Sequence, residues 1–230
     1  MSKRPEIEAP QLTVDVVIFT VDKGELKVLL LERGEDPYKG VLALPGGFMW
    51  ESERLESTAS RILLEKTGLE KVFIEQLYSF DDLSRDPRGR ILSVAYYALI
   101  EVGKLATDLN KHRADFVSVA DLPRKLAFDH NQIISYAVSR LRSKLLYTNS
   151  IRSLLPVEFT FNELQECYEA VLGHRLDKRN FRKKYLSLKL IAPTGGQVTG
   201  LRHRPAALYS FIDKDIVELP SPAFSSKSEG

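Results

Sequence analysis

Cysteine, methionine and tryptophan are scarce in this 230-residue chain, which has one cysteine, two methionines and one tryptophan. The single cysteine, Cys167, excludes an internal disulfide and a zinc site built from several cysteines. No stretch approaches the roughly 20 apolar residues of a membrane-spanning helix, and the first residues have no apolar segment typical of a secretion signal. The sequence therefore predicts a cytoplasmic protein with no membrane partner.

Acidic residues are nearly absent between positions 175 and 204, where Asp177 alone stands among nine lysines and arginines. Because the whole chain carries a net charge of only +2, the remainder of the chain is acidic. Such asymmetry is typical of a surface that binds a polyanion. A basic window can also be the solvated face of an amphipathic helix, and basic charge alone does not separate DNA from RNA as a partner.

A spaced motif runs from Gly47 to Leu69 and resembles the Nudix box, whose pattern is Gly, five residues, Glu, seven residues, then Arg-Glu-apolar-X-Glu-Glu-X-Gly-apolar. The positions that fall on this pattern are Gly47, Glu53, Arg61, Leu63, Glu65, Gly68 and Leu69. The resemblance implies a Nudix fold, and Nudix enzymes hold Mg²⁺ against a diphosphate at this motif.

Two positions of the box depart from the pattern, because Ile62 and Lys66 replace glutamates. Being four apart on a helix, they share one face. Mg²⁺ binds through carboxylates and waters, whereas isoleucine offers no oxygen and an ammonium repels a metal ion. Without the metal, water activation and leaving-group stabilisation are lost. The sequence thus predicts a domain that binds a diphosphate without cutting it, with no catalytic residue, no metal and no cofactor.

The pattern of apolar residues predicts strands and helices in the first two thirds of the chain. Four strands are expected, at residues 13–21, 26–33, 72–80 and 91–101. A helix is expected from about residue 53 to 67, with Gly68 just after its end, and another over residues 131–146. Hairpins mixed with helices indicate an α/β sandwich.

Further segments of the first domain indicate which Nudix proteins the chain resembles. Residues 44–48, 84–90 and 94–97 are similar to ADP-ribose pyrophosphatases and to the Nudix-related regulators of NAD metabolism. Together with the box, the similarity covers roughly residues 12–145. The first eleven residues, 1–11, are expected to be an N-terminal tail.

A second domain is predicted after Asn149. Asn162 is expected to cap a helix, with Gln165 at the capping-box position and Gly173 at the end. After a short turn, Asp177 is expected to cap a second helix, which is basic.

Two strands, at about residues 190–196 and 206–212, are expected to follow as a glycine-tipped wing. The predicted fold class is therefore α/β, a Nudix α/β sandwich followed by a C-terminal winged helix-turn-helix. The predicted domains are a Nudix-like ligand-sensing domain at residues 12–147, a winged helix at 148–219 and a disordered tail at 220–230.

A degenerate Nudix domain joined to a basic winged helix resembles the NrtR family of repressors of NAD metabolism. This resemblance implies a homodimer that binds double-stranded operator DNA and represses genes of NAD biosynthesis or salvage. It also implies that ADP-ribose or a related nucleotide diphosphate is the effector that releases the DNA. A hinge between the domains is expected around residues 147–151.

The expected ligand contacts are box residues, arginines that can meet phosphates and aromatic rings that can stack on a base, namely Arg33, Glu53, Arg61, Glu65, Phe80, Arg85, Arg88 and Phe116. Arg61 and Glu65, four apart, are also expected to pair with each other. The expected DNA contacts lie on the basic helix and the wing, and are Lys178, Arg179, Arg182, Lys183, Arg202, His203 and Arg204.

Three other functions stay open on the sequence alone. The first is an active Nudix hydrolase of ADP-ribose, which would use Glu53, Glu65 and a displaced metal. A second is an RNA-binding or RNA-processing protein. The third is a related regulator of another pathway, such as pentose use, that has the same architecture and a different ligand.

Overall fold

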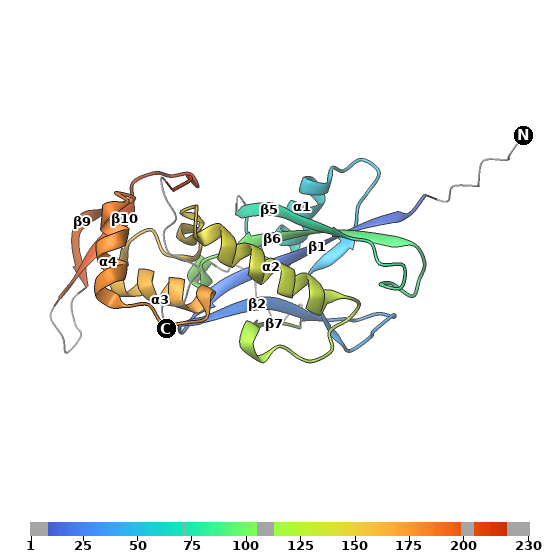
Figure 1. Cartoon of the computed structure of the whole chain (residues 1–230). Coiled ribbons are helices and arrows are strands. Elements are labelled where there is room, and N and C mark those ends of the chain that lie inside the picture. The colour runs from blue at the N-terminus through green and yellow to red at the C-terminus, as the bar shows by residue number, and fades with distance from the viewer. Residues whose placement is uncertain (1–8, 71, 105–112, 199–204, 220–230) are drawn as a thin grey trace, which may run out of the picture.

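The computed structural model describes residues 9–70, 72–104, 113–198 and 205–219. Its first domain is a sheet with a helix packed on each face (Figure 1). The strands are β1 (Gln11–Asp22), β2 (Glu25–Glu32), β3 (Leu42–Ala43), β4 (Gly46–Phe48), β5 (Phe73–Phe80), β6 (Ile91–Leu99) and β7 (Ala114–Ser118), and the helices are α1 (Leu55–Thr67) and α2 (His130–Leu145). Among the described residues, no helix is long and apolar enough to cross a membrane.

The central strand of this sheet is β1, and it is buried on both faces. The strand order is β3-β2-β1-β6-β5, with β4 paired to β1 and β7 paired to β2, and the β1–β6 pair is parallel. Side chains alternate along a strand, so Val14, Val16 and Ile18 join the core beneath α1, while Val17 and Phe19 join the core beneath α2. The predicted α/β sandwich is confirmed.

The box helix α1 ends where the sequence predicts and begins two residues later than predicted. Gly68 adopts a left-handed backbone with φ 71°, and its N–H donates to the Leu64 carbonyl at 2.8 Å. Glu53, expected as the first helical residue, instead lies in a turn where its N–H donates to the Trp50 carbonyl at 3.0 Å. This turn frees the Glu53 carboxylate to reach across to the helix.

The second domain is a winged helix-turn-helix. It comprises β8 (Phe159–Thr160), α3 (Phe161–Leu172), α4 (Lys178–Ser187), β9 (Ile191–Val198) and β10 (Ala206–Phe211), and its three strands pair in the order β8-β10-β9. Asp177 caps α4 as predicted, since its carboxylate accepts the Asn180 N–H at 2.8 Å. The two predicted wing strands are confirmed as β9 and β10, and most of the turn predicted between them lies outside the described residues.

The predicted start of α3 at Asn162 is also wrong. Thr160 is the N-cap, its hydroxyl accepts the Glu163 N–H at 3.2 Å, and the Glu163 carboxylate accepts the Thr160 N–H in return. This capping box begins the helix two residues earlier and includes Phe161, which is 7% exposed, in its first turn. The predicted end at Gly173, with φ 79°, is confirmed.

The two domains share one core. A single apolar cluster includes buried residues of β1, α2, α3 and α4, and residues 147–151 pass between the domains beside it. Thr148, Asn149, Ser150 and Ile151 are at most 4% exposed. The segment is also tied to residues 215–219, because the Asn149 N–H donates to the Val217 carbonyl and the Leu219 N–H donates to the Tyr147 carbonyl. The predicted hinge is therefore a buried and hydrogen-bonded junction.

Candidate functional site

The box residues Glu53 and Arg61 form a two-point ion pair. Arg61 Nε and Nη2 donate to the two Glu53 oxygens at 2.7 and 2.9 Å. The hydrogen bond from Arg61, helped by those from Thr58 and the Trp50 N–H, outweighs the opposing effect of desolvation and lowers the pKa of Glu53 to about 2. The expected pair with Glu65 is present but longer, at 3.4 Å. Arg61 also lies 3.9 Å over the ring of Trp50, so all three predicted box residues stabilise the loop before α1.

The two substituted box positions lie in different surroundings. Ile62 is 1% exposed and belongs to the apolar core beneath α1, close to Gly47. Lys66 is only partly buried. Within the described parts of the chain, no three His, Cys, Asp or Glu side chains are grouped so that they could hold a metal ion. The box therefore presents an apolar core residue and a cation where the pattern has carboxylates.

Two of the predicted arginines meet around an aromatic ring that the sequence analysis did not assign to the site. The Arg33 guanidinium lies 4.8 Å from the Phe128 ring centroid, and Arg88 lies 5.5 Å from it and 5.2 Å from that of Phe48. Burial, followed by the nearby Arg88, lowers the pKa of Arg33. Tyr38 packs edge-on against Phe128 at 4.9 Å. The result is a wall of rings and cations beside strand β4.

A third predicted arginine, Arg85, is a buried structural cation. Its side chain is 3% exposed and pairs with Asp129 at 2.9 Å and Asp15 at 3.4 Å. Because both carboxylates occupy it, Arg85 has no free face for a phosphate in this conformation. Its predicted ligand role is not supported by its position.

Asp15 is the centre of a buried polar network. Its carboxylate accepts the Ser93 hydroxyl at 2.5 Å, and His130 Nε2 lies 3.6 Å away. Burial opposes ionisation, but His130, Ser93 and Arg85 outweigh it and hold the pKa of Asp15 below its usual value. His130 Nδ1 accepts the Leu44 N–H at 2.9 Å, so one imidazole joins β1, α2 and the chain just before β4.

The two predicted stacking residues are both withdrawn into the apolar cores. Phe80 is 6% exposed and its ring edges are covered by Tyr78 and Tyr136, with centroids at 5.6 and 6.1 Å. It has no open face for a base. Phe116, on β7, is partly buried against the core beneath α1. The exposed rings near the box are instead Phe48 (39%) and Trp50 (57%), which only their position beside the box glycines could have indicated.

The basic helix α4 presents its cations to solvent. Lys178, Arg179, Arg182 and Lys183 are exposed, whereas Phe181 on the same helix is 2% exposed and packs inward. Arg182 lies 4.6 Å over the Phe161 ring, and its Nη2 donates to the Tyr209 hydroxyl at 3.1 Å. Those contacts hold Arg182 against the wing strand β10. The other predicted DNA contacts, Arg202, His203 and Arg204, lie outside the described residues.

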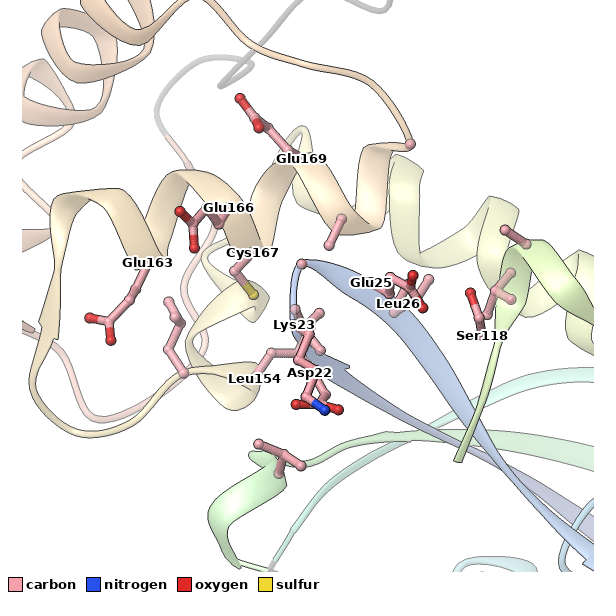
Figure 2. A pocket seen from close by; sticks show the side chains of 18 of the residues that line it. Asp22, Lys23, Glu25, Leu26, Ser118, Leu154, Glu163, Glu166, Cys167 and Glu169 are labelled. Atoms are coloured by element: carbon pink, nitrogen blue, oxygen red, sulfur yellow. The ribbon is translucent and has the colours of Figure 1, made fainter. Parts of the chain in front are cut away.

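A cavity of about 1070 Å³ separates part of the winged helix from the first domain. In Figure 2, Glu163, Glu166 and Glu169 project from α3 on one side, and Asp22 and Lys23 lie on the β1–β2 turn opposite. Further lining residues are Glu25, Leu26, Ser118 and Leu154. The Cys167 sulfur faces this space from α3, and burial raises the pKa of its thiol. The cavity thus marks where the helix-turn-helix meets the sheet.

Both domains match known families. Residues 9–137 match the NUDIX domain, and residues 151–211 match the NrtR DNA-binding winged helix domain. The ADPR responsive transcriptional repressor NtrR of Acinetobacter baylyi is 38% identical over 218 residues, which are 93% of this chain and 86% of that protein.

Solved structures of similar proteins agree with these family matches. Shewanella oneidensis NrtR complexed with a 27mer DNA is 39% identical, with a TM-score of 0.80 over 87% of this chain and 93% of that one. The NUDIX domain of the same protein complexed with ADP ribose is 40% identical, with a TM-score of 0.51 over 59% of this chain and 90% of that one. A NUDIX domain and an NrtR winged helix domain both match, and the Acinetobacter baylyi relative is 38% identical over 93% of this chain. The chain therefore belongs to the NrtR family of Nudix-related transcriptional regulators.

Proposed function

We propose that this protein is a transcriptional repressor that binds operator DNA through its winged helix and responds to ADP-ribose bound in its Nudix domain. One observation carries this function. A Nudix box that lacks two carboxylates and a helix-turn-helix with an exposed basic helix occur in one chain and share one core. The Acinetobacter baylyi relative is named as a repressor responsive to ADPR, which supports the same reading.

The ligand lies against β4, between the ring-and-arginine wall and the loop before α1. Arg33 and Arg88 supply positive charge for the diphosphate. Arg88 also pairs with Asp86 at 2.7 Å, but its side chain is 38% exposed, whereas that of Arg85 is buried. The exposed rings of Phe48 and Trp50 offer faces for the base. Glu53 and Arg61 keep the loop in shape through their ion pair. Glu65 pairs with Arg61, and Phe116 packs against the core beneath α1, so both contribute less to ligand binding.

The Nudix domain does not hydrolyse its ligand. Support comes from Ile62, which is in the apolar core, and from Lys66, which places a cation on the same helix face. Formation of AMP and ribose 5-phosphate from ADP-ribose, measured with Mg²⁺ or Mn²⁺, tests this. Cleavage at an enzyme-like rate, on the order of 1 s⁻¹ or more, would instead favour the hydrolase.

DNA is read by α4 from the major groove, with Lys178, Arg179 and Arg182 of its N-terminal half near base edges. Lys183 meets the phosphate backbone, as do Arg202 and Arg204 of the wing, with His203 beside them. Two winged helices in a homodimer bind two half-sites related by a two-fold axis. The regulated genes belong to NAD biosynthesis or salvage, and ADP-ribose releases the repressor from them.

Selection of duplex DNA from a randomised pool by the full-length protein tests this function. A palindromic site recovered from the pool, and lost on addition of ADP-ribose, is the expected result. Structured RNA that competes better than the selected duplex would favour RNA binding. Release by a pentose or sugar phosphate, but not by ADP-ribose, would assign the protein to another pathway, and mass spectrometry of the co-purified ligand gives an independent answer.

A further inference from the structure

Helix α2 touches the candidate ligand site with its first residue. His130 begins the helix, and its Nδ1 accepts the N–H of Leu44, two residues before Gly46. The other ring nitrogen faces Asp15, against which Gly46 is packed so closely that an added Cβ would lie 2.1 Å from the carboxylate. Leu44, strand β4 and the start of α2 are therefore joined through one polar network.

The last turn of the same helix touches the helix-turn-helix. Arg142 Nε donates to the Val171 carbonyl at 2.8 Å. Val171 is the second-last residue of α3, so its carbonyl has no partner within the helix, and a cation is favoured there. The Arg142 guanidinium also lies against Gly173, where an added Cβ would be 2.9 Å from Nη2. Arg142 thus contacts the turn between α3 and α4.

Helix α2 is well suited to carry a displacement between these ends. Ile133, Ile134, Ala137, Leu141 and Leu145 are all completely buried, so the helix is held along its length. A packed helix shifts as a unit because tightly packed interiors deform little. Figure 1 shows α2 lying across the sheet with its C-terminal end toward the winged helix.

The junction at residues 147–151 offers no alternative hinge. Residues 148–151 are buried, and the segment is hydrogen-bonded to residues 215–219, so free rotation there would break several contacts. A change in orientation of the winged helix must then come from the elements that contact it. Two elements that contact it, β1 and α2, also carry residues of the polar network, Asp15 and His130. Strand β1 is fixed between β2 and β6 within the sheet, whereas α2 packs on the face of the sheet and donates a side-chain hydrogen bond to α3.

We propose that Arg142 is the positioning residue that transmits ligand binding from α2 to the helix-turn-helix. Displacement of β4 by a bound nucleotide shifts His130 and α2, and Arg142 then moves the turn between α3 and α4. This rests on the proposed function. Arg142 touches neither the ligand site nor the exposed face of α4, so it acts on the coupling between the two sites and on neither site directly.

The test compares Arg142→Ala with Arg140→Ala, which removes the same charge from the same helix. Arg140 pairs with Glu75 of β5 and stays within the first domain. For each full-length protein, the dissociation constant for the selected duplex is measured by fluorescence anisotropy, with and without saturating ADP-ribose. Their ratio is the coupling factor, which is commonly about 5- to 150-fold.

The expected result is that Arg142→Ala lowers the coupling factor at least fivefold, or to unity, and leaves the ADP-ribose affinity of free protein within about twofold of wild type. His130 and Arg142 are about 18 Å apart along the helix, which is why the ligand site is spared. Arg140→Ala keeps the full coupling factor, and Arg142→Lys, which retains a donor, restores part of it. An Arg142→Ala coupling factor within twofold of wild type overturns the proposal.

Hydrogen exchange at residues 171–176 separates this proposal from the proposed function. In wild type, ADP-ribose should change amide exchange in this turn, and Arg142→Ala should abolish the change. If exchange responds in wild type but DNA affinity does not, the proposed function fails and the transmission stands. If exchange in the wild-type turn ignores ADP-ribose, or responds equally in Arg142→Ala, the transmission is refuted.

Discussion

Replacing Gly46 by alanine should destabilise the protein strongly, whereas the same change at Gly47 should not. A Cβ at Gly46 would lie 2.1 Å from Asp15 Oδ1 and 3.2 Å from the Val14 carbonyl oxygen. Asp15 cannot withdraw easily, because it is buried and accepts a hydrogen bond from Ser93. At Gly47 the closest atom to an added Cβ is Ile62 Cδ1, at 3.8 Å, which is ordinary contact.

The expected cost follows from those contacts. Forcing one extra carbon into a packed site costs about 1–3 kcal/mol. Displacing a buried carboxylate from its donors adds about 1–3 kcal/mol more. Gly46→Ala should therefore lower the free energy of unfolding by about 2–6 kcal/mol, and Gly47→Ala should stay within about 1 kcal/mol of wild type.

Urea unfolding of the two full-length variants and the wild type, followed by circular dichroism, measures the difference. The two substitutions are neighbours, change the same atoms and lie on the same short strand, so general effects of alanine cancel between them. Equal unfolding free energies for Gly46→Ala and Gly47→Ala would refute the packing argument. Such a result would mean that Asp15 can leave its network at little cost, and that the network does not hold β4 in place.

Three further predictions concern charge. Without metal, the Ile62→Glu, Lys66→Glu double variant should unfold at a lower temperature than wild type. Mg²⁺ should raise the melting temperature of this variant but not that of wild type. If calorimetry shows no effect of Mg²⁺ on the variant, the box geometry is lost. In gel shifts, Arg182→Ala should weaken specific DNA binding by about 1–3 kcal/mol and relax preference at one position per half-site, whereas Lys183→Ala should weaken all sequences alike. Folding lowers the pKa of Asp15 from its unfolded value of about 4. Ionised Asp15 therefore stabilises the protein at pH values above about 4, and this contribution is lost as the pH falls through the folded pKa. Asp15→Asn should therefore be less stable at neutral pH and show a flatter loss of stability in acid, and parallel pH profiles would contradict this.

Local rules predicted much of the fold. Gly68 and Gly173 end their helices as expected because a left-handed residue after a helix strongly favours glycine. The start of α3 was missed because Thr160 to Glu163 and Asn162 to Gln165 are overlapping capping patterns. The choice between them depends on Phe161, which packs against Phe181 and Tyr209 from other elements.

The candidate site was harder to predict because its contacts are long-range. Arg85 looks like a loop arginine in the sequence, yet its partner Asp129 is 44 residues away. A clue was present in Asp15, an acid within an apolar strand, which requires a buried partner. Sequence spacing indicates which residues share a helix face, but not which distant residue neutralises a charge.

The two substitutions in the Nudix box differ in how firmly the fold retains them. Lys66 is only partly buried, so a glutamate could replace it with little effect on stability. Ile62 fills the core beneath α1 close to Gly47, and a glutamate there would lose apolar packing and bury a carboxylate. Such a carboxylate is costly without a partner, and a bound metal ion is the partner that would compensate it. Restoring the box therefore makes stability depend on Mg²⁺, whereas the natural pair of residues folds without it. A sensor gains from this, because a ligand that is not cleaved stays in equilibrium with its site, and only differences in affinity between states can move DNA binding.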